Sequence, residues 1–193
     1  LKRRLAYSTM SNLSYVLFGA LLLTGDGLQA GLMHLVFHAL MKITLFFCAG
    51  AVLVQTGRGR VSDLRGLSKR MPFICAAFLF CAVELVGIPP FVGFQSKWAL
   101  AMAGLAAGNA LGVIGVCALI LSAVLTAVYL LAPAVGAYAL PPEPCAAPLE
   151  EACYDPGWRM KTCIGALCLA MLALVAYSGP LIRFLTGVAA GVY

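Results

Sequence analysis

The chain has 193 residues, of which 63% are hydrophobic and only 10% charged, and its mean hydropathy is +0.99. A soluble domain is about 45–50% apolar and about 25% charged, so this composition excludes a soluble enzyme and indicates a membrane protein. The net charge of +6 is interpreted as a signal of loop orientation rather than of nucleic-acid binding. The chain starts at leucine without a signal peptide, so we expect a C-terminal piece of a longer protein.

Six apolar blocks follow one another, and each is predicted to form a helix. Most have close to the roughly 17–25 residues that a membrane-spanning helix needs. The blocks are Tyr7–Leu23, Leu28–Gln55, Pro72–Ile88, Phe91–Ala107, Ala110–Ala137 and Cys163–Leu185. The predicted fold class is therefore an all-α membrane protein with about six transmembrane helices.

Charges between the blocks predict the orientation. Five bases and one acid separate the second and third blocks, whereas Pro141–Pro156 holds Glu143, Glu150, Glu151 and Asp155 without a base. If every block crosses once, the positive-inside rule places Lys2–Arg4 and the Arg58–Arg70 loop in the cytoplasm. The acidic segment then lies outside.

Two residues, Arg159 and Lys161, do not fit this layout, because they fall on the outer side. A competing layout joins residues 72–107 into one bent crossing and moves the acidic segment inside. Six crossings are preferred, because this alternative fits the charge bias less well and its crossing is long.

The cysteines do not predict a metal site. Six of the eight lie inside apolar blocks, and their spacing is not typical of zinc or iron–sulfur ligands. We interpret them as small apolar residues, and we expect no metal and no cofactor. Cys145 and Cys153 share the acidic segment and would be able to pair in an oxidising compartment, a disulfide that we do not predict.

Three titratable residues are spaced four apart in the second block: His34, His38 and Lys42. Each four-residue step rises about 6 Å and turns the helix by about 40°, so their side chains form a ladder on one face. Rungs about 6 Å apart need bridging water, and the ladder predicts a proton relay along a hydrated path. In the alternative, each histidine donates to a neighbouring carbonyl and Lys42 pairs with an acid outside this chain.

The stretch Gly87–Pro90 predicts a helix break, because proline lacks a backbone N–H and glycine permits non-helical dihedral angles. Transporters build ion sites at such breaks, and Lys97 follows one to two turns later. In the alternative, the turn is tight and Lys97 reaches an interface. Glu84, one turn before the break, would pair with Lys97 across it or lie in the outer headgroup region.

Four motifs occur in the first hundred residues: Leu1–Ser11, His34-x3-His38-x3-Lys42, Arg65–Pro72 and Gly87–Lys97. Together they resemble the antiporter-like membrane subunits of respiratory complex I, which also occur in Mrp cation/proton antiporters and membrane-bound hydrogenases. The remainder of the chain is supported only by its apolar blocks.

The resemblance implies an architecture of two inverted five-helix repeats, each with half of a proton path. This chain would hold the second repeat and a final helix. The implied parts are a partial repeat over residues 1–137, an acidic outer loop over 138–162, and a terminal helix and tail over 163–193.

The resemblance also implies roles for individual residues. Lys42 corresponds to the central lysine of the half-channel, and His34 and His38 to the polar groups that lead to it. Lys97 corresponds to the terminal ionisable residue at the broken helix, where some relatives have glutamate. Glu84 matches no functional residue of the family, so it is only an additional candidate for the proton path.

The predicted function is a proton-translocating membrane subunit of a complex I-like NADH:quinone oxidoreductase or membrane-bound hydrogenase, without a redox site of its own. The alternatives are an Mrp-type Na+/H+ antiporter subunit and a structural scaffold whose buried lysines form ion pairs. Expected partners are other membrane and peripheral subunits, the lipid bilayer, and protons or Na+, but no nucleic acid. The expected location is the cell inner membrane, crossed several times.

Overall fold

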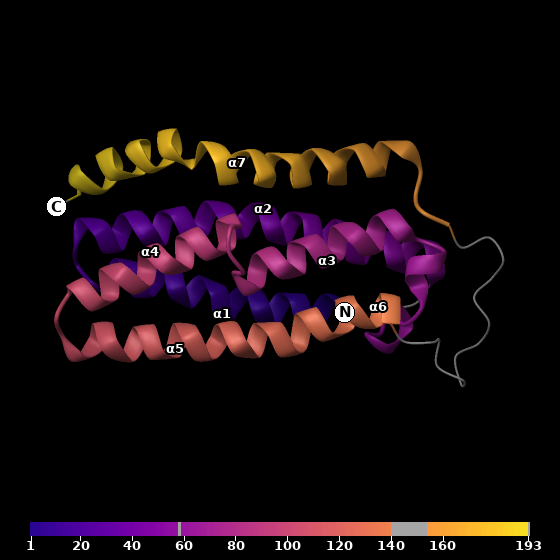
Figure 1. Ribbon diagram of the computed structural model, residues 1–193, viewed down its shortest axis with the longest axis horizontal. Coiled ribbons are helices and arrows are strands. Elements are labelled where there is room, and N and C mark those ends of the chain that lie inside the picture. Colours follow the sequence, from indigo (N-terminus) through magenta and orange to yellow (C-terminus); the bar gives the residue numbers. More distant parts are fainter. Residues whose placement is uncertain (58, 140–153, 193) are drawn as a thin grey trace.

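The computed structural model describes residues 1–57, 59–139 and 154–192, and over these residues it is helical without strands (Figure 1). The helices are α1 (Lys2–Leu21), α2 (Gly25–Thr56), α3 (Pro72–Val86), α4 (Val92–Ala106), α5 (Ala110–Thr126), α6 (Ala132–Ala139) and α7 (Trp158–Ala190). The π-helical segment η3 (Ala127–Leu131) joins α5 to α6, and two short 3-10 turns, η1 (Ser62–Leu64) and η2 (Leu67–Lys69), precede α3.

Local sequence explains where several helices start and end. Thr24 and Asn109 cap the starts of α2 and α5, because their side-chain oxygens accept the N–H of Gly27 at 3.1 Å and of Gly112 at 2.8 Å. α2 ends at Gly57, which adopts a left-handed conformation with φ of 65°.

Three helical stretches are long and apolar enough to cross a membrane. They are Gly25–Thr56, Ala110–Ala139 and Trp158–Ala190, with mean hydropathies of 1.9, 2.6 and 1.9 over their most apolar windows. The predicted all-α membrane fold is confirmed.

The central helix is α2, which contacts α1, α3, α4 and α7. The crossing of α1 with α2 is close, because a Cβ at Gly19 would lie 2.5 Å from the carbonyl oxygen of Gly27. Membrane helices often pack through small residues that let their backbones approach closely, because the hydrophobic effect contributes little to helix association in lipid. α2 itself contributes Phe37, Met41 and Leu45 to the core, and none of these side chains is exposed.

The two half-helices α3 and α4 lie end to end along α2, with residues 87–91 between them (Figure 1). Each half has 15 residues and spans about 22 Å, less than the roughly 30 Å of a hydrocarbon core. Neither half therefore crosses alone. Each predicted block does form a helix, and the end-to-end position of α3 and α4 favours the alternative layout, a bent crossing over residues 72–107, over two separate crossings.

The bent crossing also changes the sides on which the charges lie. Asp155 accepts the backbone N–H groups of Phe73 at 3.2 Å and Ile74 at 3.3 Å, so it lies at the start of α3. With the bent crossing, Asp155 lies on the same side as the basic loop, whereas six separate crossings would place residues 138–162 on the opposite side. Glu143, Glu150, Glu151, Cys145 and Cys153 lie outside the described residues, as does Arg58.

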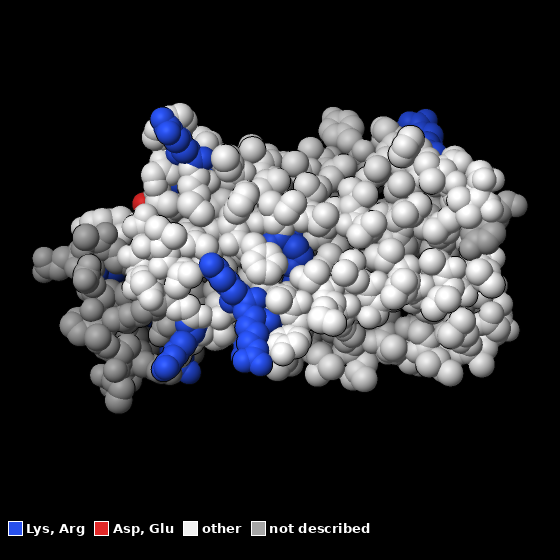
Figure 2. All heavy atoms as spheres, turned by 180° about the vertical axis from the view of Figure 1, so that it is seen from behind, with Lys and Arg blue, Asp and Glu red and all other residues white. Residues whose placement is uncertain are grey.

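We call this end of the molecule, with the start of α1, residues 59–71 and the start of α7, the basic end. Arg159 and Lys161, which contradicted the predicted layout, join the other bases here, and Lys161 lies 3.7 Å from the Asp155 carboxylate. Seen from behind, the basic side chains gather mainly over the half of the molecule with the start of α1, and most of the remaining visible face is uncharged (Figure 2).

Candidate functional site

The buried face of α1 is polar. Ser8, Asn12 and Tyr15 follow one another at helical spacing and are 3%, 1% and 6% exposed. The Asn12 amide donates to the Ser8 carbonyl at 2.9 Å. Because this face packs on α2, the crossing of α1 and α2 has a polar interior rather than an apolar one.

The predicted ladder of α2 faces this interior. His34, His38 and Lys42 are 0%, 3% and 5% exposed, and the two imidazole rings stack with centroids 5.9 Å apart. His34 Nδ1 forms a hydrogen bond with Ser96 Oγ of α4 at 2.9 Å, whereas neither ring nitrogen of His38 has a hydrogen-bond partner in the part of the chain that the structure describes. The histidine spacing is that of the predicted ladder, too long for a direct hydrogen bond.

Lys42 is held by α1. Its Nζ donates to the Leu5 carbonyl at 3.0 Å, an oxygen one turn before Ser8. A cavity of about 620 Å³ reaches Lys42 and His38 from the outer surface between α1 and α2, and its other walls are mainly apolar. The ladder is thus accessible from a cavity as well as enclosed by helices.

The predicted helix break is present. α3 ends at Gly87, which adopts φ of 88°, and α4 begins at Val92. Lys97 reaches back across the break, and its Nζ donates to the carbonyls of Leu85 at 2.7 Å and Val86 at 2.9 Å. These carbonyls lie at the end of α3, where the helix leaves acceptors unpaired and its dipole favours a cation.

Tyr15 connects the break to the ladder. Its ring lies 5.3 Å from the His34 ring, edge to face, and the Lys97 Nζ lies 5.9 Å from the centre of the Tyr15 ring. Lys97 therefore lies beside the end of the ladder opposite Lys42. We call the set formed by Ser8, Asn12, Tyr15, His34, His38, Lys42, Ser96 and Lys97 the polar seam.

Neither predicted position of Glu84 is observed. The side chain is completely buried in the protein, away from any lipid headgroup, and its Oε2 accepts the N–H of Gly93 at 3.4 Å. Within residues 1–57, 59–139 and 154–192 neither Lys42 nor Lys97 forms an ion pair, so Glu84 does not pair with Lys97.

A family model described as "NADH:quinone oxidoreductase/Mrp antiporter, TM" matches residues 1–126. The chain belongs to this family. The resemblance predicted from the four motifs is confirmed, and the match includes the whole polar seam.

Individual members of the antiporter family agree over longer stretches. The chain is 42% identical over 127 residues to NADH-quinone oxidoreductase subunit N of Desulforudis audaxviator, covering 66% of this chain and 25% of the relative. It is 32% identical over 183 residues to NADH-quinone oxidoreductase subunit N 2 of Syntrophobacter fumaroxidans, covering 95% of this chain and 37% of the relative. The chain therefore spans well under half the length of these curated relatives.

A solved structure extends the likeness to the fold. A chain of the Mrp complex from Dietzia sp. DQ12-45-1b superposes with a TM-score of 0.78 at 28% identity, covering 96% of this chain and 41% of that chain. The likeness includes residues beyond the family match, such as most of α7.

Sequence reasoning missed part of the seam of this antiporter-family chain. Ser96, Tyr15, Asn12 and Ser8 were not predicted, although the i, i+4, i+7 spacing of the polar residues in α1 was a readable sign of a polar face. Ser96 carried no such sign, because its role depends on how α4 packs on α2.

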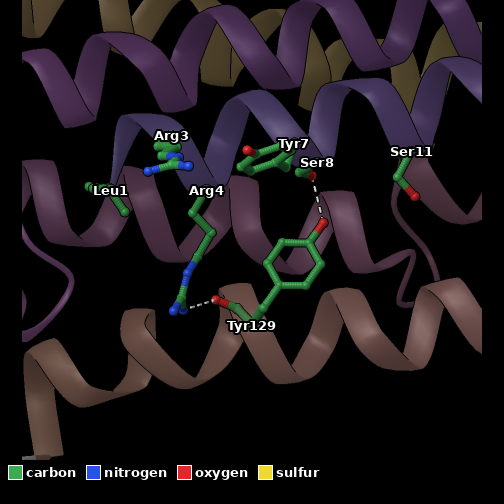
Figure 3. Close-up of a pocket in the computed structure, with 7 residues that line it drawn as sticks. All are labelled: Leu1, Arg3, Arg4, Tyr7, Ser8, Ser11 and Tyr129. Carbon is green, nitrogen blue, oxygen red and sulfur yellow. Dashed lines mark hydrogen bonds between the residues drawn. The ribbon is translucent and has the colours of Figure 1, made fainter.

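A second cavity lies at the basic end, between α1 and η3 (Figure 3). It has a volume of about 480 Å³ and is lined by Leu1, Arg3, Arg4, Tyr7, Ser8, Ser11 and Tyr129. Arg4 donates to the Tyr129 carbonyl at 2.8 Å, and the Tyr129 hydroxyl donates to Ser8 Oγ at 2.6 Å. Because Ser8 belongs to both, this cavity meets the polar seam.

Proposed function

We propose that this chain carries part of the proton path of an ion-translocating subunit in a complex I-like NADH:quinone oxidoreductase or membrane-bound hydrogenase. The observation that carries the proposal is the polar seam, whose two histidines and two lysines are at most 5% exposed. A charged side chain at the centre of a membrane helix costs about 2.5–3.5 kcal/mol on insertion scales, so such residues are functional candidates.

The proposed path runs from Lys42 through His38 and His34 to Lys97. An imidazole can take a proton on one nitrogen and release it from the other, and an amine can hold or release one. The 5.9 Å between the histidine rings leaves one water-mediated step between them. Ser96 fixes the orientation of His34, and the carbonyls that end α3 hold Lys97 when it is charged.

Protons are the proposed cargo rather than Na+. The seam offers nitrogen groups that exchange protons, whereas hard cations prefer clustered oxygen ligands. The carbonyls of Leu85 and Val86 at the break already accept Lys97. The nitrogen groups of the seam and the occupied carbonyls at the break disfavour the Na+/H+ antiporter alternative. The scaffold alternative requires ion pairs of the buried lysines, and these lysines form none within the described residues.

The remaining proposals concern placement and assembly. The positive-inside rule supports a cytoplasmic position for the basic end, with the chain crossing the cell inner membrane. Residues 1–137 are proposed as part of the second five-helix repeat and residues 163–193 as the terminal helix. The relatives are named as oxidoreductase subunits and the solved neighbour as part of a complex, which supports partner subunits that carry the electron-transfer chemistry.

The test is proton translocation by the complete subunit, reconstituted in its complex in sodium-free vesicles and followed with a pH-sensitive dye. We expect Lys42→Ala to assemble normally and to lose the translocation that this subunit carries. Translocation at the unmodified rate by an assembled Lys42→Ala complex would overturn the relay. Strict dependence on added Na+ would instead favour the exchanger.

A further inference from the structure

Glu84 is a buried carboxyl residue at the break that the proposed path does not use. It lies on α3 one turn before Gly87, and none of its surface is exposed. Its Oε1 has no hydrogen-bond partner among the described residues, although a buried carboxyl oxygen is normally paired. A carboxyl group left half-paired inside a membrane protein needs a reason other than packing.

The other oxygen faces the start of α4. Oε2 accepts the N–H of Gly93, the second residue of α4, where backbone N–H groups have no partner within the helix. The contact depends on glycine, because a Cβ at Gly93 would collide with the Glu84 carbonyl oxygen. The half-helix α4 thus presents its positive end to Glu84 at very short range.

Lys97 occupies the complementary position. Gly93 and Lys97 are four residues apart on α4, so they share a face, and Lys97 donates to the carbonyls of Leu85 and Val86, the two residues after Glu84. The negative end of α3 therefore receives the ammonium, and the positive end of α4 receives the carboxylate. The break holds an acid and a base, each beside the helix end that stabilises its charged form.

We propose that Glu84 is a further proton-binding residue of the path, acting with Lys97 as an acid–base couple across the break. This inference rests on the proposed function. In the forward step the O–H bond of the neutral carboxylic acid breaks, its proton passes along intervening water molecules, and an N–H bond forms on the neutral amine. The products are a carboxylate on the Gly93 N–H and an ammonium on the α3 carbonyls, and the reverse step restores the neutral pair.

The couple differs from an ion pair that only ties helices together. Such a pair would join the two charges directly, whereas here each side chain contacts backbone at the opposite end of the junction. The other titratable side chains near Glu84 are thiols, Cys81 on α3 and Cys168 on α7. Two basic side chains border this junction among the described residues: Lys97, and His34 through Ser96, whose hydroxyl also donates to the Gly93 carbonyl.

The test uses Glu84→Gln in the complete subunit within its complex, because glutamine keeps the volume and can still accept the Gly93 N–H but cannot exchange a proton. We expect translocation to fall to the level of Lys97→Met with normal assembly. Glu84→Asp should restore part of it, and Cys81→Ala, one turn away on the same helix, should leave it unchanged.

The translocation rates of the three variants separate the role of Glu84 from the proposed function. Unmodified translocation by Glu84→Gln, with Lys97→Met and Lys42→Ala inactive, would overturn the role of Glu84 and leave the proposed function standing. Unmodified translocation by all three would overturn the proposed function itself. If Glu84→Gln fails to assemble, infrared difference spectra of the unmodified complex during turnover decide instead. A carboxylic acid C=O band that shifts in Glu84→Asp supports the couple, and the absence of any responding carboxyl band contradicts it.

Discussion

Two helices of this protein, α2 and α7, have nearly the same length and hydropathy but opposite surroundings. They contain 32 and 33 residues, and the most apolar window of each has a mean hydropathy of 1.9. In α2, 56% of that window is buried, whereas in α7 only 11% is buried. Hydropathy therefore identifies both as membrane helices and cannot tell which one encloses a site.

The position of the ionisable residues makes the difference. α2 buries His34, His38 and Lys42 against polar groups of α1 and α4, whereas Arg183 of α7 is exposed near the end of its helix. The distortions differ in the same way. The kink of α7 at Tyr177 occurs at a residue that is 74% exposed, while the break between α3 and α4 places its freed backbone groups against Glu84 and Lys97.

The largest expected contrast in stability is between two leucines. Leu45 of α2 is completely buried, and Leu45→Ala should lower stability by about 2–5 kcal/mol because it leaves a cavity. Leu169 of α7 is 67% exposed, so Leu169→Ala should stay within about 0.5 kcal/mol. Thermal unfolding of the purified complete subunit measures both. Equal losses would mean that α7 is packed as tightly as α2.

A smaller contrast is expected between two glycines. Gly93→Ala should cost about 1–3 kcal/mol, because the added methyl group collides with the Glu84 carbonyl and forces the two half-helices apart. Gly179 of α7 has open space at its Cβ position, so Gly179→Ala is the matched control. The fraction of subunit assembled in membranes reports the difference, and a normally assembled Gly93→Ala would argue against a tight junction.

The smallest effect is expected at a single hydrogen bond. Ser96→Ala removes the partner of His34 Nδ1 and should cost about 1 kcal/mol, with slower proton translocation because the ring is no longer held. Ser178→Ala on α7 should change neither quantity. Parallel rate and unfolding measurements separate the two effects, and an unchanged rate in Ser96→Ala would remove Ser96 from the seam.

Much of this molecule could be predicted from the sequence, because its signals are local. The apolar blocks gave the helices, and the spacing of His34, His38 and Lys42 gave a buried ladder. The two prolines and Gly87 gave the break. Each of these features depends on a helix or a turn and not on how helices pack.

The features that depend on how the helices pack could not be predicted from the sequence. Blocks 72–88 and 91–107 are each long enough to be counted as a crossing, and only their position along α2 shows that they share one. Counted as two crossings, the blocks would place Asp155 on the side opposite the start of α3, which it contacts. The partners of His34 and Glu84, Ser96 and Gly93, lie 62 and 9 residues away, and sequence spacing does not report such contacts.

The most direct test of the central claim compares one basic residue from each long helix. Lys42→Met and Arg183→Met remove the same charge, the first from the buried seam of α2 and the second from the exposed surface of α7. The measurement is the initial rate of proton translocation by assembled complexes in vesicles. We predict loss of this subunit's translocation in Lys42→Met and a normal rate in Arg183→Met. Equal rates in the two variants would contradict a proton path through α2.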